Sequence, residues 1–215
     1  FRSDASTEAV RETAGEVLKY KGNIVTTYYY STSCGKTTTM KAWGTSENES
    51  NGYLQSVEVK DKNGDYEKSL PWYRWEADID QDILSALLAE NVKKNIGTVQ
   101  SLEVTKTGPG GVALQIKTVG DKGSITVDTE NKIRKALGGN GYEIKKQDGT
   151  VAQSGTLLPS AFFKVKKAGN IFKIIGGGYG HGIGMSQNGA NEMAKKGKNY
   201  QEILKMFYPG TTIEK

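Results

Sequence analysis

Alternating apolar and polar positions predict short strands along much of the chain. Residues 24–31 read IVTTYYYS, so one face of this strand can be buried while the other stays exposed. With residues 16–20 they predict a hairpin around Lys21-Gly22-Asn23. Further strands are expected at 53–59, 72–79, 99–105, 112–119 and 124–128, with short strands between 142 and 165.

Helical spacing of apolar residues predicts a smaller number of helices. Asp80 is expected to cap a helix that runs to about residue 90, with Leu84, Leu87 and Leu88 on one face. The other helices are expected at 6–13, 129–137, 188–196 and 199–207.

This order of elements lacks the regular strand–helix alternation of a doubly wound sheet. We therefore predict an α+β fold, with a mixed, largely antiparallel sheet and peripheral helices. A length of 215 residues suits one large domain, and residues 1–215 are expected to form it. Residues 64–165 carry fewer motifs and are a candidate lobe inserted within that domain.

Charge changes the list of expected partners. The chain has 29 Lys and Arg against 24 Asp and Glu, a formal net charge of +5. This balance favours anionic partners, such as nucleic acid, an anionic membrane surface or wall polymers. The lysines are scattered in pairs, for example Lys93-Lys94 and Lys195-Lys196, which is typical of a solvated surface. A nucleic-acid partner is therefore not expected.

Composition also bears on the compartment. No apolar run approaches the length that spans a bilayer. Cys34 is the only cysteine, so no intrachain disulfide is expected, as in cytosolic proteins and in many exported proteins of Gram-positive bacteria. The sequence starts at Phe1 without a methionine or a signal peptide, and we expect a fragment or a processed chain.

Residues 176–187, GGGYGHGIGMSQ, hold six glycines and the only histidine. Glycine is used where backbone bends sharply or approaches another group closely, so the tract predicts a shaped loop before a helix. Neither nucleotide fingerprint fits it, and Ser186 lacks the GxSxG of a hydrolase elbow. One histidine and one cysteine do not supply a zinc ligand set, so neither a metal nor another cofactor is expected.

Longer stretches carry a family resemblance. Residues 178–190 read GYGHGIGMSQNGA, residues 12–18 read ETAGEVL, and residues 30–37 read YSTSCGKT. They resemble the GHGxGMSQxGA, ETxGEVL and YSxSxGKT stretches of the stage II sporulation protein D / LytB (SpoIID/LytB) family. Ser160 and Phe162 also resemble a serine–phenylalanine step of that family. The chain is identified as the C-terminal portion of the family domain, whose N-terminal part is absent.

The resemblance implies an extracytoplasmic protein, in the cell wall or anchored outside the membrane, that acts on peptidoglycan. The sporulation member is a lytic transglycosylase that cuts glycan strands already stripped of stem peptides by a partner amidase. Cleavage occurs beside N-acetylmuramic acid, whose 6-hydroxyl closes an anhydro ring, and it requires a carboxyl group that serves as acid and then base. Expected partners are glycan strands, with a cell-wall amidase and a membrane-anchored protein as further candidates.

The family's catalytic glutamate lies upstream of the ETxGEVL block, and this chain contains no counterpart of its motif. No residue here inherits the acid role, so the catalytic residue is unknown and activity as an enzyme stays open. We expect either part of a longer lytic transglycosylase or a natural variant without catalysis. The alternative function is a non-catalytic glycan-binding module that enhances or recruits a cell-wall amidase, as other family members are described.

Four residues of the glycine-rich tract are candidates for substrate binding. His181 can donate and accept hydrogen bonds near neutral pH, or it can tie the loop to nearby carbonyls. Ser186 suits either a ligand or a helix N-cap. Gln187 can donate to and accept from sugar hydroxyls or acetamido groups. Tyr179 is the aromatic residue most expected to contact a ligand, whereas aromatic residues of the strands, such as Trp72, are more often core.

The polar loop after residue 30 supplies three more candidates for substrate binding. Ser31, Ser33 and Lys36 suit a carbohydrate or a carboxylate such as the lactyl group of muramic acid, with ordinary turn chemistry as the alternative. Cys34 lies among them and could pair with His181 as a cysteine hydrolase. No local signature of such an enzyme surrounds Cys34, so an inert thiol is favoured.

Overall fold

Five α-helices, three short 3-10 helices and five β-sheets make up residues 3–215, the part of the chain that the computed structural model describes. The α-helices are α1 (Asp4–Glu12), α2 (Gln81–Val92), α3 (Glu130–Leu137), α4 (Gln187–Lys195) and α5 (Tyr200–Phe207). The 3-10 helices are η1 (Met40–Trp43), η2 (Pro71–Tyr73) and η3 (Pro109–Gly111). None of the helices described is long and apolar enough to cross a membrane.

The largest sheet has five antiparallel strands in the order β11-β10-β6-β13-β12. Its strands are β6 (Trp75–Asp80), β10 (Glu143–Lys146), β11 (Val151–Gln153), β12 (Phe163–Ala168) and β13 (Ile171–Gly176). Alternate residues of β6 are buried, namely Trp75, Ala77 and Ile79, as the period of two predicts. Helix α2 follows β6 directly, and Asp80 caps it through a 2.8 Å bond from the Asp82 amide.

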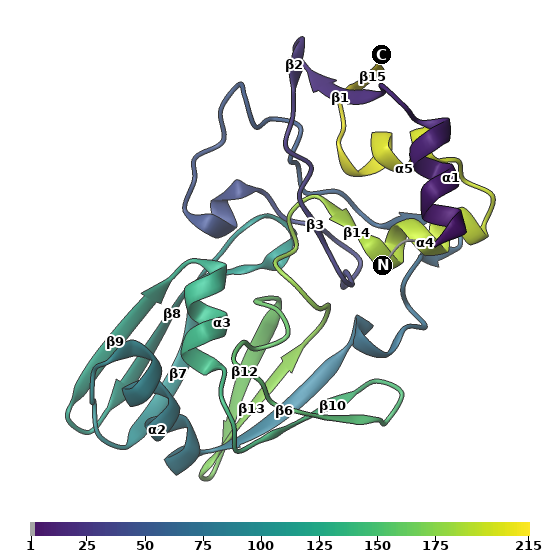
Figure 1. Cartoon of the computed structure of the whole chain (residues 1–215). Helices are drawn as coiled ribbons and strands as arrows, with labels where there is room; N and C mark the ends of the chain where they lie inside the picture. The colour runs from purple at the N-terminus through teal and green to yellow at the C-terminus, as the bar shows by residue number, and fades with distance from the viewer. Residues whose placement is uncertain (1–2) are drawn as a thin grey trace.

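A second sheet is the antiparallel meander β7 (Val99–Thr107), β8 (Ala113–Gly120) and β9 (Gly123–Asp128). Helix α3 packs against β8 and β9 and also contacts α2 (Figure 1). These elements contribute buried aliphatic side chains to the hydrophobic core, among them Leu88, Ile116 and Ile133.

The remaining strands lie near the two ends of the chain. Strands β1 (Val17–Tyr20), β2 (Asn23–Ile24) and β15 (Thr212–Glu214) form an antiparallel sheet, and β3 (Tyr29–Tyr30) pairs in parallel with β14 (Met185–Ser186). Strands β4 (Lys60–Asp61) and β5 (Gly64–Asp65) form a small hairpin. Figure 1 shows α1, α4, α5 and the β1–β15 pair gathered in one part of the molecule, so the N-terminal and C-terminal motifs meet there.

The predicted α+β class with largely antiparallel sheets is confirmed, since the β3–β14 pair is the single parallel pairing among the named strands of residues 3–215. The boundaries of the inserted lobe stay a prediction. Residues 64–165 contain β6, β10 and β11, which share their sheet with β12 and β13.

Two strand predictions need correction. Residues 53–59 form no strand, because Tyr53 and Leu54 are buried in a turn and only Val57 and Val59 make main-chain bonds to residues 35–37. Residues 24–31 form two short pieces, β2 and β3, with irregular backbone between them. At 53–59 the apolar pattern reports burial, which irregular backbone also satisfies. In residues 24–31 only Tyr30 is buried, whereas Ile24 and Tyr29 are exposed.

Candidate functional site

The glycine-rich tract and the polar loop run side by side, although about 150 residues separate them. The Thr32 amide donates to the Tyr179 carbonyl at 3.1 Å, and the Tyr179 amide donates to the Thr32 carbonyl at 2.8 Å. Further along, the Thr38 amide donates to the Gly182 carbonyl at 2.7 Å. These bonds join two motif-bearing segments from opposite ends of the chain into one surface.

Close approach of the two segments explains a glycine in the tract. Gly184 has a φ of +75°, and a Cβ placed on it would lie 2.1 Å from the carbonyl oxygen of Tyr28. An L-residue here would suffer both a left-handed backbone and a clash with main chain, so the motif demands glycine for steric reasons.

His181 is held by the backbone on both sides of its ring. Its Nε2 lies 2.9 Å from the Tyr29 carbonyl, and the Ile183 amide donates to its Nδ1 at 3.1 Å. Because Nδ1 accepts a hydrogen bond from an amide, the ring is neutral, with its proton on Nε2. Burial lowers the pKa of His181, an effect that the nearby Glu130 carboxylate partly offsets. His181 therefore acts as a neutral clamp between the tract and β3.

The lowered pKa of His181 predicts a pH-dependent contribution to stability. The unfolded chain binds a proton near pH 6.5, whereas the folded chain resists protonation until a lower pH, so this stabilisation is present above pH 6.5 and is lost as the pH falls. We expect the cost of His181→Gln in the free energy of unfolding to be largest at pH 7.5 and to shrink toward pH 5. Urea unfolding of both proteins across this range measures it. A cost that stays constant with pH would contradict the neutral clamp.

A buried carboxylate joins two of the predicted residues. The Ser33 amide donates to Glu67 Oε1 at 3.0 Å, the Ser186 hydroxyl donates to the same oxygen at 2.7 Å, and the Ser33 hydroxyl donates to Oε2. Glu67 has no exposed surface. Burial raises its pKa, while the bonds from the two serines act in the opposite direction. Glu67 is not among the residues predicted from the sequence, because no local pattern marks a glutamate that becomes buried.

Ser186 has several partners at once. It is the N-cap of α4, accepting from the Gly189 amide at 3.2 Å, and it also accepts from the Ser33 amide at 3.1 Å. Ser33 and Ser186 are both buried, so their hydrogen bonds stabilise the fold at the point where the two segments meet. Their role in substrate binding stays a prediction.

Three of the other candidates lie on the surface. Tyr179 is 43% exposed, and its ring centroid lies 4.8 Å from that of Trp72. Gln187 is the exposed first residue of α4. Lys36 is exposed and lies 3.4 Å from Glu58. Ser31 is half-buried beside the Thr32 hydroxyl at 3.1 Å. The seven predicted residues thus divide into a buried scaffold and a surface that a ligand can reach.

Cys34 lacks the environment of a nucleophile. Burial raises the pKa of its thiol, with the Arg74 guanidinium acting against that rise. A reactive cysteine needs a lowered pKa, and a partner histidine needs a free ring nitrogen. Both nitrogens of His181 contact main-chain groups, so the geometry does not favour a cysteine hydrolase.

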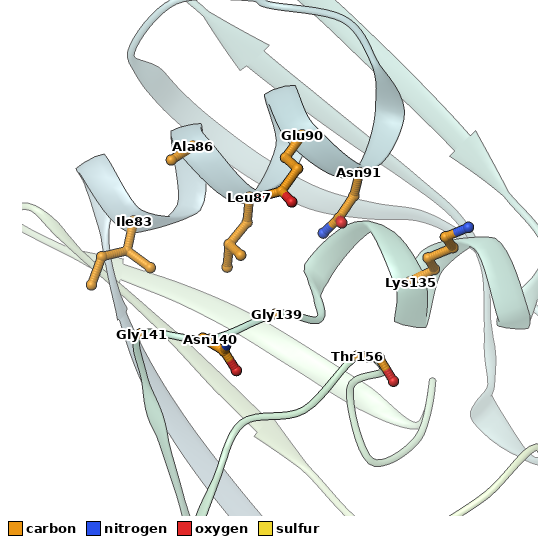
Figure 2. A pocket seen from close by; sticks show the side chains of 10 residues that line it. All are labelled: Ile83, Ala86, Leu87, Glu90, Asn91, Lys135, Gly139, Asn140, Gly141 and Thr156. Atoms are coloured by element: carbon orange, nitrogen blue, oxygen red, sulfur yellow. The ribbon is translucent and has the colours of Figure 1, made fainter.

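A pocket of about 500 Å³ lies apart from this site, between α2, α3 and the loop at 138–141 (Figure 2). Leu87 points toward Gly139 across it, and Glu90 and Lys135 lie at its edges. None of the seven predicted site residues lines this pocket. Among residues 3–215, no group of three or more His, Cys, Asp or Glu side chains is placed to hold a metal ion.

Comparison with known proteins agrees with the motifs. Residues 39–184 match the family described as "Domain of unknown function (DUF8618)". Stage II sporulation protein D of Bacillus subtilis is 30% identical over 96% of this chain and 50% of its own length, and that of Bacillus amyloliquefaciens gives the same figures. The amidase enhancer of Bacillus subtilis is 29% identical over 96% of this chain and 32% of its own length.

The chain spans about half the length of the sporulation relatives and about a third of the amidase enhancer. Within that span the alignment includes both the polar loop and the glycine-rich tract, since it covers 96% of the chain. The chain therefore belongs to the DUF8618 domain family and is a homologue of stage II sporulation protein D and the amidase enhancer, as its motifs predict.

Proposed function

We propose that this domain binds glycan strands of the bacterial cell wall as part of a lytic transglycosylase that acts on peptide-stripped strands. The observation that carries the proposal is the joining of the polar loop to the glycine-rich tract, which leaves Tyr179 exposed on the ring of Trp72. Paired aromatic rings at a surface present flat apolar faces with polar edges, a good match to a pyranose ring. The homologous sporulation proteins support the same assignment.

The domain's share of the proposed reaction is binding and positioning of the glycan. Glu67 and Glu130 are the two fully buried glutamates of the described chain, and neither reaches a glycosidic oxygen from its buried position. A general acid must come within hydrogen-bond distance of the oxygen that it protonates. Because this chain also carries no counterpart of the family's glutamate motif, we assign the acid role to no residue of it and propose that a segment upstream in the family domain supplies the acid.

The alternative function is a non-catalytic module that enhances a cell-wall amidase. The alignment with a protein named amidase enhancer over 96% of this chain favours it. The two functions share the glycan-binding surface and differ in whether any glycosidic bond breaks.

Binding and product analysis test both functions. We expect the chain to bind peptide-free glycan strands in calorimetry, and Tyr179→Ala to weaken that binding several-fold to about tenfold, because an aromatic contact contributes about 0.5–1.5 kcal/mol. Tyr200 is the matched control, because it is also 43% exposed but bonds to Glu16. Tyr200→Ala should leave glycan binding unchanged.

The strands recovered from this experiment distinguish the alternatives. Anhydro-muramic ends in mass spectrometry after incubation with a chain extended upstream, and not with this chain alone, would support the transglycosylase. Binding without such ends from either chain, together with faster amidase turnover when the domain is added, would support the enhancer. Absence of both glycan binding and amidase stimulation would overturn both functions.

A further inference from the structure

A groove runs along the surface beside the glycine-rich tract. It measures about 610 Å³ and lies between the loop at 34–36 and the β4–β5 hairpin on one side, and the start of β12 and the end of β13 on the other. It shares Arg74 and Ile175 with a smaller hollow of about 260 Å³ that continues toward Lys145 and Lys146. Arg74 thus lines both hollows, which are together called the depression below.

Positive charge exceeds negative charge in this depression. Six cationic side chains and three carboxylates line the two hollows together. Lys36 and Lys60 share Glu58 at 3.4 and 2.5 Å. The other four cations have no ion-pair partner within residues 3–215, and they are Arg74, Lys145, Lys146 and Lys164. A concave surface with excess positive charge attracts an anionic ligand.

The side chain of Arg74 is held in place mainly by hydrogen bonds from one of its three nitrogens. Its Nη1 donates to the Cys34 carbonyl at 3.0 Å and to the Tyr73 carbonyl at 2.7 Å, and its guanidinium carbon lies 3.9 Å from the centre of the Tyr73 ring. A Cβ on Gly177 would lie 3.1 Å from Nη1, so the arginine lies against the tract itself. The bonds to carbonyl groups use only Nη1, and the guanidinium also interacts with the Tyr73 hydroxyl, which acts to lower the pKa of that group. The remaining N–H groups can bind a planar anion.

Lys146, which lines the smaller hollow, connects it to the aromatic pair. Lys146 lies 5.1 Å above the ring of Trp72, which contacts Tyr179. A ligand that fills the groove therefore meets cations, and one that extends past Lys146 also meets the aromatic pair. An acidic sugar offers both a carboxylate and a ring for these contacts.

We propose that Arg74 binds the lactyl carboxylate of muramic acid and thereby selects glycan strands that carry it free. In a strand that still carries stem peptides, this carboxyl group forms an amide bond with the peptide and bears no charge. After an amidase has removed the peptide, each muramic residue presents an anion. The proposal deepens the function proposed above and rests on it.

Three glycans test this selection by calorimetry: peptide-free strands, the same strands with the lactyl carboxyl reduced to an alcohol, and neutral chitooligosaccharide. We expect the wild-type chain to bind the carboxylate strands about ten- to hundredfold more tightly than the reduced strands, because a charge-assisted bond to the arginine is lost. Arg74→Gln should bind both alike, and Arg74→Lys should keep a small part of the preference. Arg11→Gln, at an exposed arginine paired with Glu8, is the control and should behave as wild type.

The outcomes separate this inference from the proposed function. Equal wild-type binding of carboxylate and reduced strands would overturn the role of Arg74 while glycan binding stands, and it requires no variant that might misfold. A preference retained in folded Arg74→Gln would do the same. Equally tight binding of inorganic polyphosphate would reduce the groove to a general anion site and overturn the selection. Failure to bind any of the three glycans would overturn the proposed function itself.

Discussion

Replacement of Arg134 by methionine is expected to lower the free energy of unfolding by about 3–5 kcal/mol. Arg134 Nη1 lies 2.7 Å from Glu130 Oε1 on the adjacent turn of α3, and the two side chains are only 9% and 1% exposed. Without the guanidinium, Glu130 would remain a buried charge with the Trp43 indole N–H, at 3.2 Å, as its remaining donor. The bond from Arg134 Nε to the Leu158 carbonyl, at 2.7 Å, would also be lost.

Urea unfolding with matched variants tests the buried charge. The double variant Glu130→Gln/Arg134→Met should lose clearly less stability than Arg134→Met alone, because it leaves no uncompensated charge. Lys135→Met removes an exposed cation from the same helix and should change stability by no more than about 0.5 kcal/mol. Equal costs for Arg134→Met and Lys135→Met would contradict the assigned role of the ion pair.

This ion pair also connects the candidate lobe to the site. Glu130 accepts from Trp43, and the Trp43 ring centroid lies 5.1 Å from that of His181. The position of α3 therefore bears on the glycine-rich tract through a short chain of packed groups. The buried polar groups Glu130 and Arg134 thus lie within residues 64–165, where few sequence motifs were found, and they connect that region to Trp43.

The sequence predicted correctly those helices and strands whose ends are set by neighbouring residues, such as a capping residue or a turn. Helix α2 begins where Asp80 can cap it, and β7, β8 and β9 follow the turns that contain glycine. Residues 53–59 failed as a strand because their partners lie at 35–37, in a loop whose course the pattern does not reveal. Apolar alternation indicated their burial correctly and their backbone incorrectly.

The site likewise has features that the local sequence shows and features that arise only from contacts between distant residues. The glycine-rich tract and the polar loop were found from their sequences, but nothing in them separates the buried serines from the exposed Tyr179 and Gln187. Glu67 lies 34 residues from Ser33 and 119 residues from Ser186, so its role exists only in the folded chain. Residue type alone predicts an exposed glutamate at this position.

Replacement of Glu67 by leucine is expected to cost about 2–4 kcal/mol of unfolding free energy. The Ser33 amide would keep its bond to Ser186, but the Ser33 and Ser186 hydroxyls would lose their shared acceptor, and each buried unsatisfied group costs about 1–3 kcal/mol. Relief of the buried carboxylate offsets part of that sum. Hydrogen exchange should quicken at 31–37 and 184–190, because these two segments meet at Glu67, while α2 should keep its protection.

Glu67→Gln is the matched control, since its amide oxygen can still accept from both serines and its shape is preserved. Because burial raises the pKa of Glu67, its carboxyl group takes up a proton more readily in the folded chain than in the unfolded chain. That contribution is complete at acid pH and is lost as the pH rises through the folded-state pKa. The wild type should therefore gain stability relative to Glu67→Gln as the pH falls from 7 toward 4.5. An opposite trend, or a leucine variant as stable as the glutamine variant, would show that Glu67 does not hold the two segments together.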